Sequence, residues 1–265
     1  MRAKPVRGLT LDGFAFACTQ PEGRPSFGAT EVSAAVEGGG LEDCRFERLS
    51  VSAAGGIGLS LTNALRCRVA SSGICDSGAC ALVVRGTDLT VVSNRLLRTG
   101  RLFTGACGAS VGGVDVRFCA NEIRDVPYCG VCFDGDRHLY EDNRVRRVMT
   151  LQHDGAAFYG DFSAGHCTLR RNDVRDIRPN AKGVGAGCAA FCGYERRPKL
   201  GFDFGKTALF VFRMPFADIG VEVSAERKTS VPFNVTVRNA TYGETRYWES
   251  PSAAKPVPGR LEIRN

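Results

Sequence analysis

The sequence predicts an all-β protein, a right-handed parallel β-helix, and three observations support this prediction. A short phrase recurs at intervals of 22 to 29 residues. The segments around it alternate apolar and polar residues, and glycine is frequent while helix-favouring stretches are few. Leucine-rich repeats have a similar period, but the sequence lacks their Leu-x-x-Leu-x-Leu phrase and their helical half. We therefore expect a stack of short-stranded coils.

The repeated phrase has Cys or Asn two positions before a large apolar residue. Its six copies are centred on Cys44, Cys67, Asn94, Asn121, Asn143 and Asn172. Stacked coils place equivalent residues about 4.8 Å apart, so a buried Asn amide can hydrogen-bond to its counterparts above and below. Cysteine fits the same slot as a small apolar residue. We expect these six residues to form one vertical file with a structural role.

A strand is predicted just before each of the later phrases. Four segments align on a shared glycine: 82–86, 109–113, 131–135 and 156–160. Their first and third residues are apolar, which predicts that these side chains point inward and the second and fourth outward. A second alternating strand follows in each coil. Its inward side includes His138, which we expect to be a core histidine.

Composition and charge are those of an ordinary globular protein. Of the 265 residues, 43% are hydrophobic and 24% charged, which excludes wholesale disorder. No run of about 18 apolar residues is present, so we expect no membrane span. The net charge is +7, but the arginines are interspersed among acidic residues without a long basic run. This pattern favours a solvated surface over a nucleic-acid interface.

The chain has twelve cysteines. A disulfide framework is typical of shorter chains with a poor core, which does not describe this sequence. The only Cys-x-x-Cys pair is Cys129-Gly-Val-Cys132, and no second pair follows at zinc-finger spacing. We therefore expect cysteine to fill the core, and we expect no metal site.

Two regions are predicted. Residues 1–198 form the β-helix, although the coil phrase is lost in the glycine-rich stretch 181–198. Residues 199–265 contain strand-like segments without the coil pattern, which predicts a β-rich appendage or cap. The strand-like segment 8–16 begins almost at once, so we expect a short or truncated β-helix.

One stretch of coils resembles a known group of proteins. Asn143-Arg-Val145 is followed by His153-Asp-Gly-Ala-Ala-Phe-Tyr159 and then by Arg170-Arg-Asn-Asp-Val-Arg-Asp-Ile177. This stretch resembles the pectate-lyase-like superfamily, in its glycoside-hydrolase-like branch, whose coils often read Asn-x-Ile followed by Asn-Asp-x-Gly-Ala-Ile-Tyr. The resemblance covers about residues 8–180. It departs at Gly160-Asp161, where the branch commonly has Gly-Arg.

The resemblance implies a protein that acts on polysaccharide or oligosaccharide outside the cytoplasm, extracellularly or in the periplasm. The first residues of this chain do not show the pattern of a secretory signal. We further expect a monomer that binds neither nucleic acid nor membrane.

The outward side of the first strand is the predicted binding face, because solenoids bind on an extended face. Just before this strand, the column Cys80, Cys107, Cys129, Asp154 changes from thiol to carboxylate. Such a break in an apolar column is typical of a functional site. The structural alternative is that Asp154 caps a turn ahead of Gly155.

Hydrolysis of a glycosidic bond needs two carboxyl groups, one to donate a proton and one to act as base or nucleophile. We expect Asp154 to be the general acid or base and Asp134 its partner on the adjacent coil, with Asp161 in reserve. The expected substrate contacts are Tyr159, His153, Arg85 and Asp136. A hydrolase of this kind needs no cofactor.

Two alternatives remain open. A polysaccharide lyase or epimerase would use an Arg base with Ca²⁺ held by clustered carboxylates, and either Arg85 beside Asp88 or the group Asp134, Asp136 and Asp161 would serve. A non-catalytic β-helix would bind glycan without cleaving it. An ultraviolet-absorbing product and sensitivity to chelator would distinguish a lyase from a hydrolase.

Overall fold

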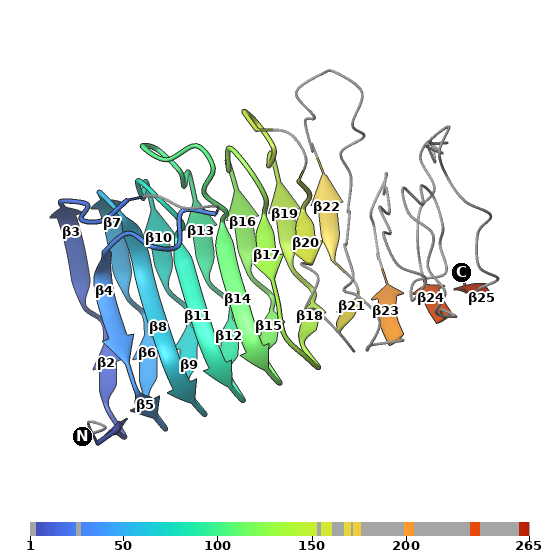
Figure 1. Ribbon diagram of the computed structural model, residues 1–265, viewed down its shortest axis with the longest axis horizontal. Helices are drawn as coiled ribbons and strands as arrows, with labels where there is room; N and C mark the ends of the chain where they lie inside the picture. Colours follow the sequence, from blue (N-terminus) through green and yellow to red (C-terminus); the bar gives the residue numbers. More distant parts are fainter. Residues whose placement is uncertain are drawn as a thin grey trace.

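The computed structural model confirms the parallel β-helix (Figure 1). It describes residues 4–24, 28–152, 155–160, 167–170, 172–175, 199–203, 234–238 and 260–264. The regular secondary structure of these residues is all β, in three parallel sheets. Within these ranges we find no helix with the length and hydropathy needed to cross a bilayer.

From β1 to β22 every coil contributes to all three sheets, and strands that pair within a sheet come from successive coils. Sheet A contains β1 (Val6–Arg7), β4 (Ala34–Gly39), β5 (Leu41–Glu42), β8 (Ile57–Leu65), β11 (Leu82–Thr87), β14 (Ala109–Val114), β17 (Val131–Phe133) and β20 (Phe158–Gly160). Sheet B contains β2 (Thr10–Asp12), β6 (Arg45–Glu47), β9 (Arg68–Ala70), β12 (Thr90–Val92), β15 (Arg117–Cys119), β18 (Leu139–Glu141), β21 (Thr168–Arg170), β23 (Lys199–Asp203), β24 (Asn234–Arg238) and β25 (Arg260–Arg264). Sheet C contains β3 (Ala15–Thr19), β7 (Ser50–Ala54), β10 (Gly73–Cys75), β13 (Arg95–Leu97), β16 (Glu122–Arg124), β19 (Arg144–Arg146) and β22 (Asp173–Arg175).

The last three strands continue sheet B. β23 pairs in parallel with β21, β24 with β23, and β25 with β24. Most of 199–265 lies outside the described residues. The predicted division of the chain at 198 and 199 therefore stays a prediction.

The predicted Asn ladder is present in sheet C. The Nδ2 atoms of Asn94, Asn121 and Asn143 lie 3.0, 3.2 and 2.9 Å from the Oδ1 atom of the next asparagine in the file, so the ladder runs from Asn94 to Asn172 within the described residues. Each Oδ1 also accepts from the preceding asparagine's backbone N–H. All four side chains are buried, so these bonds satisfy groups whose burial would otherwise be costly.

The prediction that Cys44 and Cys67 belong to this file is wrong. They precede β6 and β9 in sheet B and belong to a different column of residues. That column continues through Leu89, Val116 and His138. In sheet C the position before Asn94 is taken by Ser72, whose backbone N–H donates to Asn94 Oδ1 at 2.9 Å. The turn before each sheet B strand and the turn before each sheet C strand carry the same sequence phrase. The sequence alignment therefore followed the first turn up to Cys67 and the second turn from Asn94 onward.

The predicted inward side of the second strand is confirmed. Val91, Phe118, Tyr140 and Leu169 are paired in succession along sheet B, and all are buried. Their aromatic members pack together, with ring centroids of Phe118 and Tyr140 5.9 Å apart. His138 is 1% exposed, as expected of a core histidine.

The predicted alignment of the first strand holds for three coils and is wrong for the fourth. Leu82 pairs with Ala109 and Ala109 with Val131, but Val131 pairs with Phe158 rather than Ala156. The shift is two residues, which leaves the inward and outward alternation unchanged, so the apolar pattern cannot detect it. As a result Tyr159 pairs with Cys132 and not with Asp134.

The turns use the charged residues in ion pairs between coils. Each turn places a residue in the left-handed region, and aspartate and arginine often alternate there along the stack. The pairs with two hydrogen bonds from one guanidinium to one carboxylate include Arg66–Asp43, Arg98–Asp76 and Arg137–Asp115. These contacts agree with the expected solvated surface of interspersed charges.

Candidate functional site

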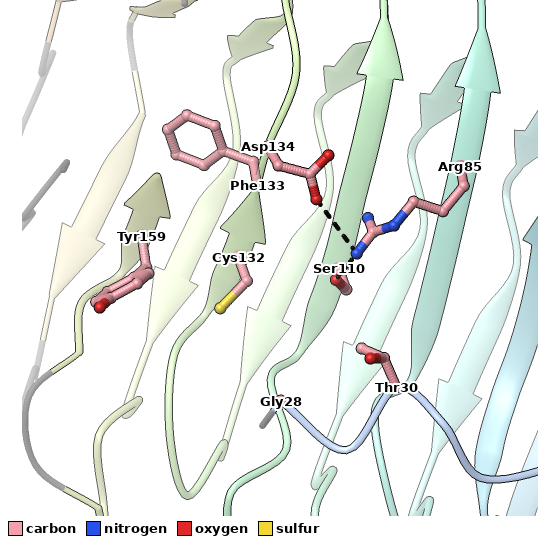
Figure 2. Close-up of a pocket in the computed structure, with 8 residues that line it drawn as sticks. All are labelled: Gly28, Thr30, Arg85, Ser110, Cys132, Phe133, Asp134 and Tyr159. Carbon is pink, nitrogen blue, oxygen red and sulfur yellow. Dashed lines mark hydrogen bonds and ion pairs between the residues drawn. The ribbon is translucent and has the colours of Figure 1, made fainter. Parts of the chain in front are cut away.

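The outer face of sheet A carries a hollow with a volume of about 100 Å³. Its lining comes from four successive coils, those of β11, β14, β17 and β20, and from the segment around residue 29 (Figure 2). The lining residues are Gly28, Thr30, Arg85, Ser110, Cys132, Phe133, Asp134 and Tyr159. The hollow lies on the face that the sequence predicts for binding.

The segment from Gly28 to Thr30 forms one wall, although it lies far from the other lining residues in sequence. Gly28 forms a parallel bridge with Ala106, just before β14. Its carbonyl oxygen lies 2.9 Å from the thiol of Cys80, which donates to it. Ala29 is fully buried, so the segment is held against the strand starts of sheet A.

Arg85 and Asp134 form an ion pair across the hollow, with Arg85 Nη2 3.4 Å from Asp134 Oδ2 (Figure 2). The same Nη2 donates to Ser110 Oγ at 2.8 Å. Both charged side chains are about one third exposed, 34% for Arg85 and 32% for Asp134. The pair is therefore ordered by its neighbours while remaining accessible to a ligand.

Gly112 makes room for this pair. It occupies the strand position next to Arg85 on the following coil. A Cβ atom at this position would lie 2.7 Å from Arg85 Nη1 and would also collide with the Asp134 carboxylate. The guanidinium and the carboxylate thus meet over the backbone of the intervening strand. Gly112 is one of the small outward residues that the sequence predicts on this face, and its role is to leave space for the ion pair.

The backbone of Asp134 is held by a core histidine. His138 Nε2 lies 2.7 Å from the carbonyl oxygen of Asp134, and His138 Nδ1 accepts the backbone N–H of Val116 at 3.1 Å. Burial lowers the pKa of His138, so the imidazole is neutral at pH 7. With Nδ1 acting as an acceptor, the proton is on Nε2, which donates to Asp134. His138 acts on the hollow by positioning Asp134.

The side of the hollow toward β20 is aromatic and contains sulfur. Tyr159 and Cys132 are paired on β20 and β17, and both side chains point outward (Figure 2). The Tyr159 ring lies beside that of Tyr128, with centroids 6.4 Å apart. Tyr159 is half-buried and packs against the core, and a tyrosine ring that is partly open beside hydrogen-bonding groups is suited to contact with a sugar ring.

Two further thiols lie behind Cys132. Its sulfur is 2.8 Å from that of Cys107, and both are within 4.8 Å of the sulfur of Cys129. Burial raises the pKa of Cys129, but hydrogen bonds from the thiols of Cys107 and Cys132 and from the Ala156 N–H outweigh it and lower that pKa to about 5. The hydrogen bond to Cys129 raises the pKa of Cys107. For Cys132, the hydrogen bond with Cys107 lowers the pKa, but the bond to Cys129 and burial outweigh it, so that pKa is raised as well.

The structure brings together three of the predicted site residues, Arg85, Asp134 and Tyr159. Asp136 does not line the hollow, and its carboxylate pairs with Arg137 at 3.1 Å. The remaining predicted residues, His153, Asp154 and Asp161, lie outside the described residues. The prediction that Asp154 follows Cys80, Cys107 and Cys129 in their column is wrong. The pairing of β17 with β20 places Ala156 at that position, and its backbone N–H points at the sulfur of Cys129.

Sequence reasoning missed Thr30 and the thiol cluster. Thr30 belongs to a segment without the coil phrase, so no periodic signal assigns it to the binding face. The expectation of no metal site considered cysteines close in sequence, whereas Cys107 precedes Cys129 by a whole coil. The predicted column of Cys80, Cys107 and Cys129 was the sequence feature that could have indicated the thiol cluster.

Comparison with known proteins gives little information about activity. No family model matches the sequence, and no curated protein matches it. A solved structure described as "Glycoside hydrolase" is similar, with 14% identity over 89% of this chain and a TM-score of 0.49. The match covers 38% of that protein. The function must therefore be argued from the residues of the hollow.

Proposed function

We propose that the chain binds an oligosaccharide segment in the hollow of sheet A and hydrolyses a glycosidic bond there. The observation that carries this proposal is the Asp134 carboxylate, held by Arg85 in an open hollow beside the ring of Tyr159. Carbohydrate sites combine such an aromatic surface with a few placed polar groups. An extracellular or periplasmic location and a monomeric state belong to the same proposal.

Asp134 acts as the base or the nucleophile in this proposal. The adjacent guanidinium favours an ionised carboxylate, which is the form that either role requires. A second carboxyl group then donates a proton to the leaving oxygen. Among the lining residues that the structure describes, Asp134 is the one with a carboxyl group. The proton donor is then Asp154 or Asp161, the two candidates that the sequence supplies.

The other lining residues bind substrate. Tyr159 stacks on a sugar ring, and the hydroxyl groups of Ser110 and Thr30 hydrogen-bond to sugar hydroxyls. Arg85 contacts substrate while it holds Asp134. These roles use side chains that line the hollow from three different coils and from the segment around residue 29.

The test is a screen of the purified protein against a glycan library, with new reducing ends and ultraviolet absorption measured together. We expect new reducing ends without an ultraviolet-absorbing product. Asp134→Asn should lower the rate by at least about 100-fold. Asp115→Asn is the matched control, because Asp115 also pairs with an arginine but lies outside the hollow.

Three results would contradict the proposal in different ways. An absorbing product lost with chelator would indicate a lyase. Glycan binding without any cleavage would indicate a binding protein. Full activity of Asp134→Asn would remove Asp134 from the reaction.

A further inference from the structure

Three cysteines from two adjacent coils converge beside the hollow. Cys107 and Cys129 each lie two residues before a paired residue of β14 and β17, so they are stacked one above the other. Cys132 follows on β17. All three sulfur atoms lie within 4.8 Å of one another.

This convergence goes beyond ordinary stacking. Equivalent side chains on neighbouring coils are about 4.8 Å apart, which is the separation expected of Cys107 and Cys129 from stacking alone. The sulfurs of Cys107 and Cys132 are instead 2.8 Å apart. They come from positions that are not paired with each other, so the side chains turn toward a common point.

We propose that Cys107, Cys129 and Cys132 form a binding site for a thiophilic metal ion, Zn²⁺ or Cu⁺. Thiolate sulfur is the ligand that these ions prefer in proteins. At a Zn–S distance of about 2.3 Å, tetrahedral coordination places sulfurs about 3.8 Å apart. The sulfur–sulfur distances in the cluster start at 2.8 Å and do not exceed 4.8 Å, so they include this range. Binding requires the sulfurs of Cys107 and Cys132 to move apart by about 1 Å.

The surroundings suit such a site. Cys107 and Cys129 are fully buried, whereas Cys132 is half-buried and lines the hollow. An ion therefore enters from the hollow, and a position remains open on that side for water or a ligand. The backbone N–H of Ala156 points at the sulfur of Cys129 at 3.4 Å, an outer contact that commonly supports a metal-bound thiolate.

A fourth thiol continues the column and has another partner. Cys80 lies one coil before Cys107 and donates to the carbonyl oxygen of Gly28 at 2.9 Å. It thereby fixes the segment that forms one wall of the hollow. We place Cys80 outside the set of ligands for this reason.

The test uses the full chain, reduced and stripped of metal under anaerobic conditions. Titration with Co²⁺ should give one equivalent of tight binding and near-ultraviolet sulfur-to-cobalt absorption, which Zn²⁺ should displace. Titration with Cu⁺ against a colorimetric chelator measures the second candidate ion. Serine at Cys107, Cys129 or Cys132 should weaken binding by at least about 100-fold.

Cys119→Ser is the matched control. Cys119 is half-buried on β15 in sheet B, outside the cluster, so its variant should bind like the wild type. Thermal melts identify variants that fail to fold. If a buried serine variant unfolds, Cys132→Ala on the hollow side provides the same comparison.

Two outcomes would overturn the proposal. One is the absence of metal uptake by the reduced protein, with peptide mapping of the untreated protein showing a Cys107–Cys132 disulfide or three free thiols. The other is uptake that all three cluster variants retain. Neither readout depends on cleavage of a glycan, so the metal site and the proposed hydrolysis can fail separately.

Discussion

Arg85 and Asp134 come from coils two apart, and they reach each other because Gly112, on the coil between them, has no side chain. The relationship could not exist with any larger residue at that position. The ion pair on the surface therefore depends on the absence of a side chain at position 112 in the strand beneath it.

Gly112→Ala should damage the hollow while leaving the fold intact. The new methyl group would meet the ends of two flexible side chains, which can move away. We expect a loss of glycan binding or hydrolysis of at least about tenfold, with a change in stability within about 1 kcal/mol. Activity assays and thermal unfolding of the same preparation measure both.

Gly113→Ala is the contrasting variant. Gly113 has a φ of +109°, and a Cβ atom there would strike the backbone carbonyl of Gly86. Because backbone cannot yield as a side chain can, we expect strong destabilisation or failure to fold. Equal behaviour of the two alanine variants would contradict this account of Gly112.

His138→Phe should lower both stability and the activity proposed for Asp134. The variant keeps an aromatic ring but leaves the buried N–H of Val116 without its acceptor, at a cost of about 1–3 kcal/mol. It also releases the carbonyl of Asp134. Reduced turnover with little change in glycan affinity would indicate a positioning role.

The pH dependence of stability provides a separate readout for His138. Burial lowers its pKa in the folded state, so the unfolded chain binds the proton more readily. The contribution of neutral His138 to stability is complete above the unfolded pKa of about 6.5 and is lost as pH falls toward the folded value. Unfolding curves between pH 7 and pH 5 should therefore decline less steeply for His138→Phe than for the wild type.

Asn121→Ala should destabilise the β-helix by roughly 2–3 kcal/mol. The substitution removes the acceptor of two donors on Asn94 and the donor to the backbone oxygen of Val91. Arg95→Ala is the control, because this side chain is exposed on the neighbouring strand and should change stability by no more than about 0.5 kcal/mol. Chemical denaturation of both variants tests the ladder.

Tyr140→Phe should stabilise the protein by about 1 kcal/mol. The Tyr140 side chain is fully buried, and its hydroxyl oxygen has no hydrogen-bond partner among the residues that the structure describes. The phenylalanine ring keeps the contact with Phe133, whose ring centroid is 4.8 Å away. Lower stability of Tyr140→Phe would show that the hydroxyl group has a partner in solution.

Several features could be predicted from the sequence because they depend on local pattern. The alternation of apolar residues predicted the strands and the inward side that contains His138. The spacing of Asn94, Asn121 and Asn143 predicted their ladder. The outward positions of Arg85 and Asp134 placed both on the binding face.

Other features depend on which residues are stacked on one another, and the same local sequence pattern is compatible with more than one stacking. Tyr159 keeps its outward direction under a shift of two residues, so alternation could not show that it lies beside Cys132. Cys67 and Asn94 carry the same phrase on different turns of the coil. The wall formed by Thr30 arises from a segment with no repeat at all.

The formation of coils and the outward direction of particular side chains can be predicted from the amino-acid sequence alone, because both follow from alternation along each strand. The tertiary structure decided which coil positions lie in contact. That choice depends on hydrogen bonds and packing between coils, which distinguish registers that the alternating pattern leaves equivalent. The meeting of Arg85 with Asp134 and of Cys107 with Cys132 was decided in this way.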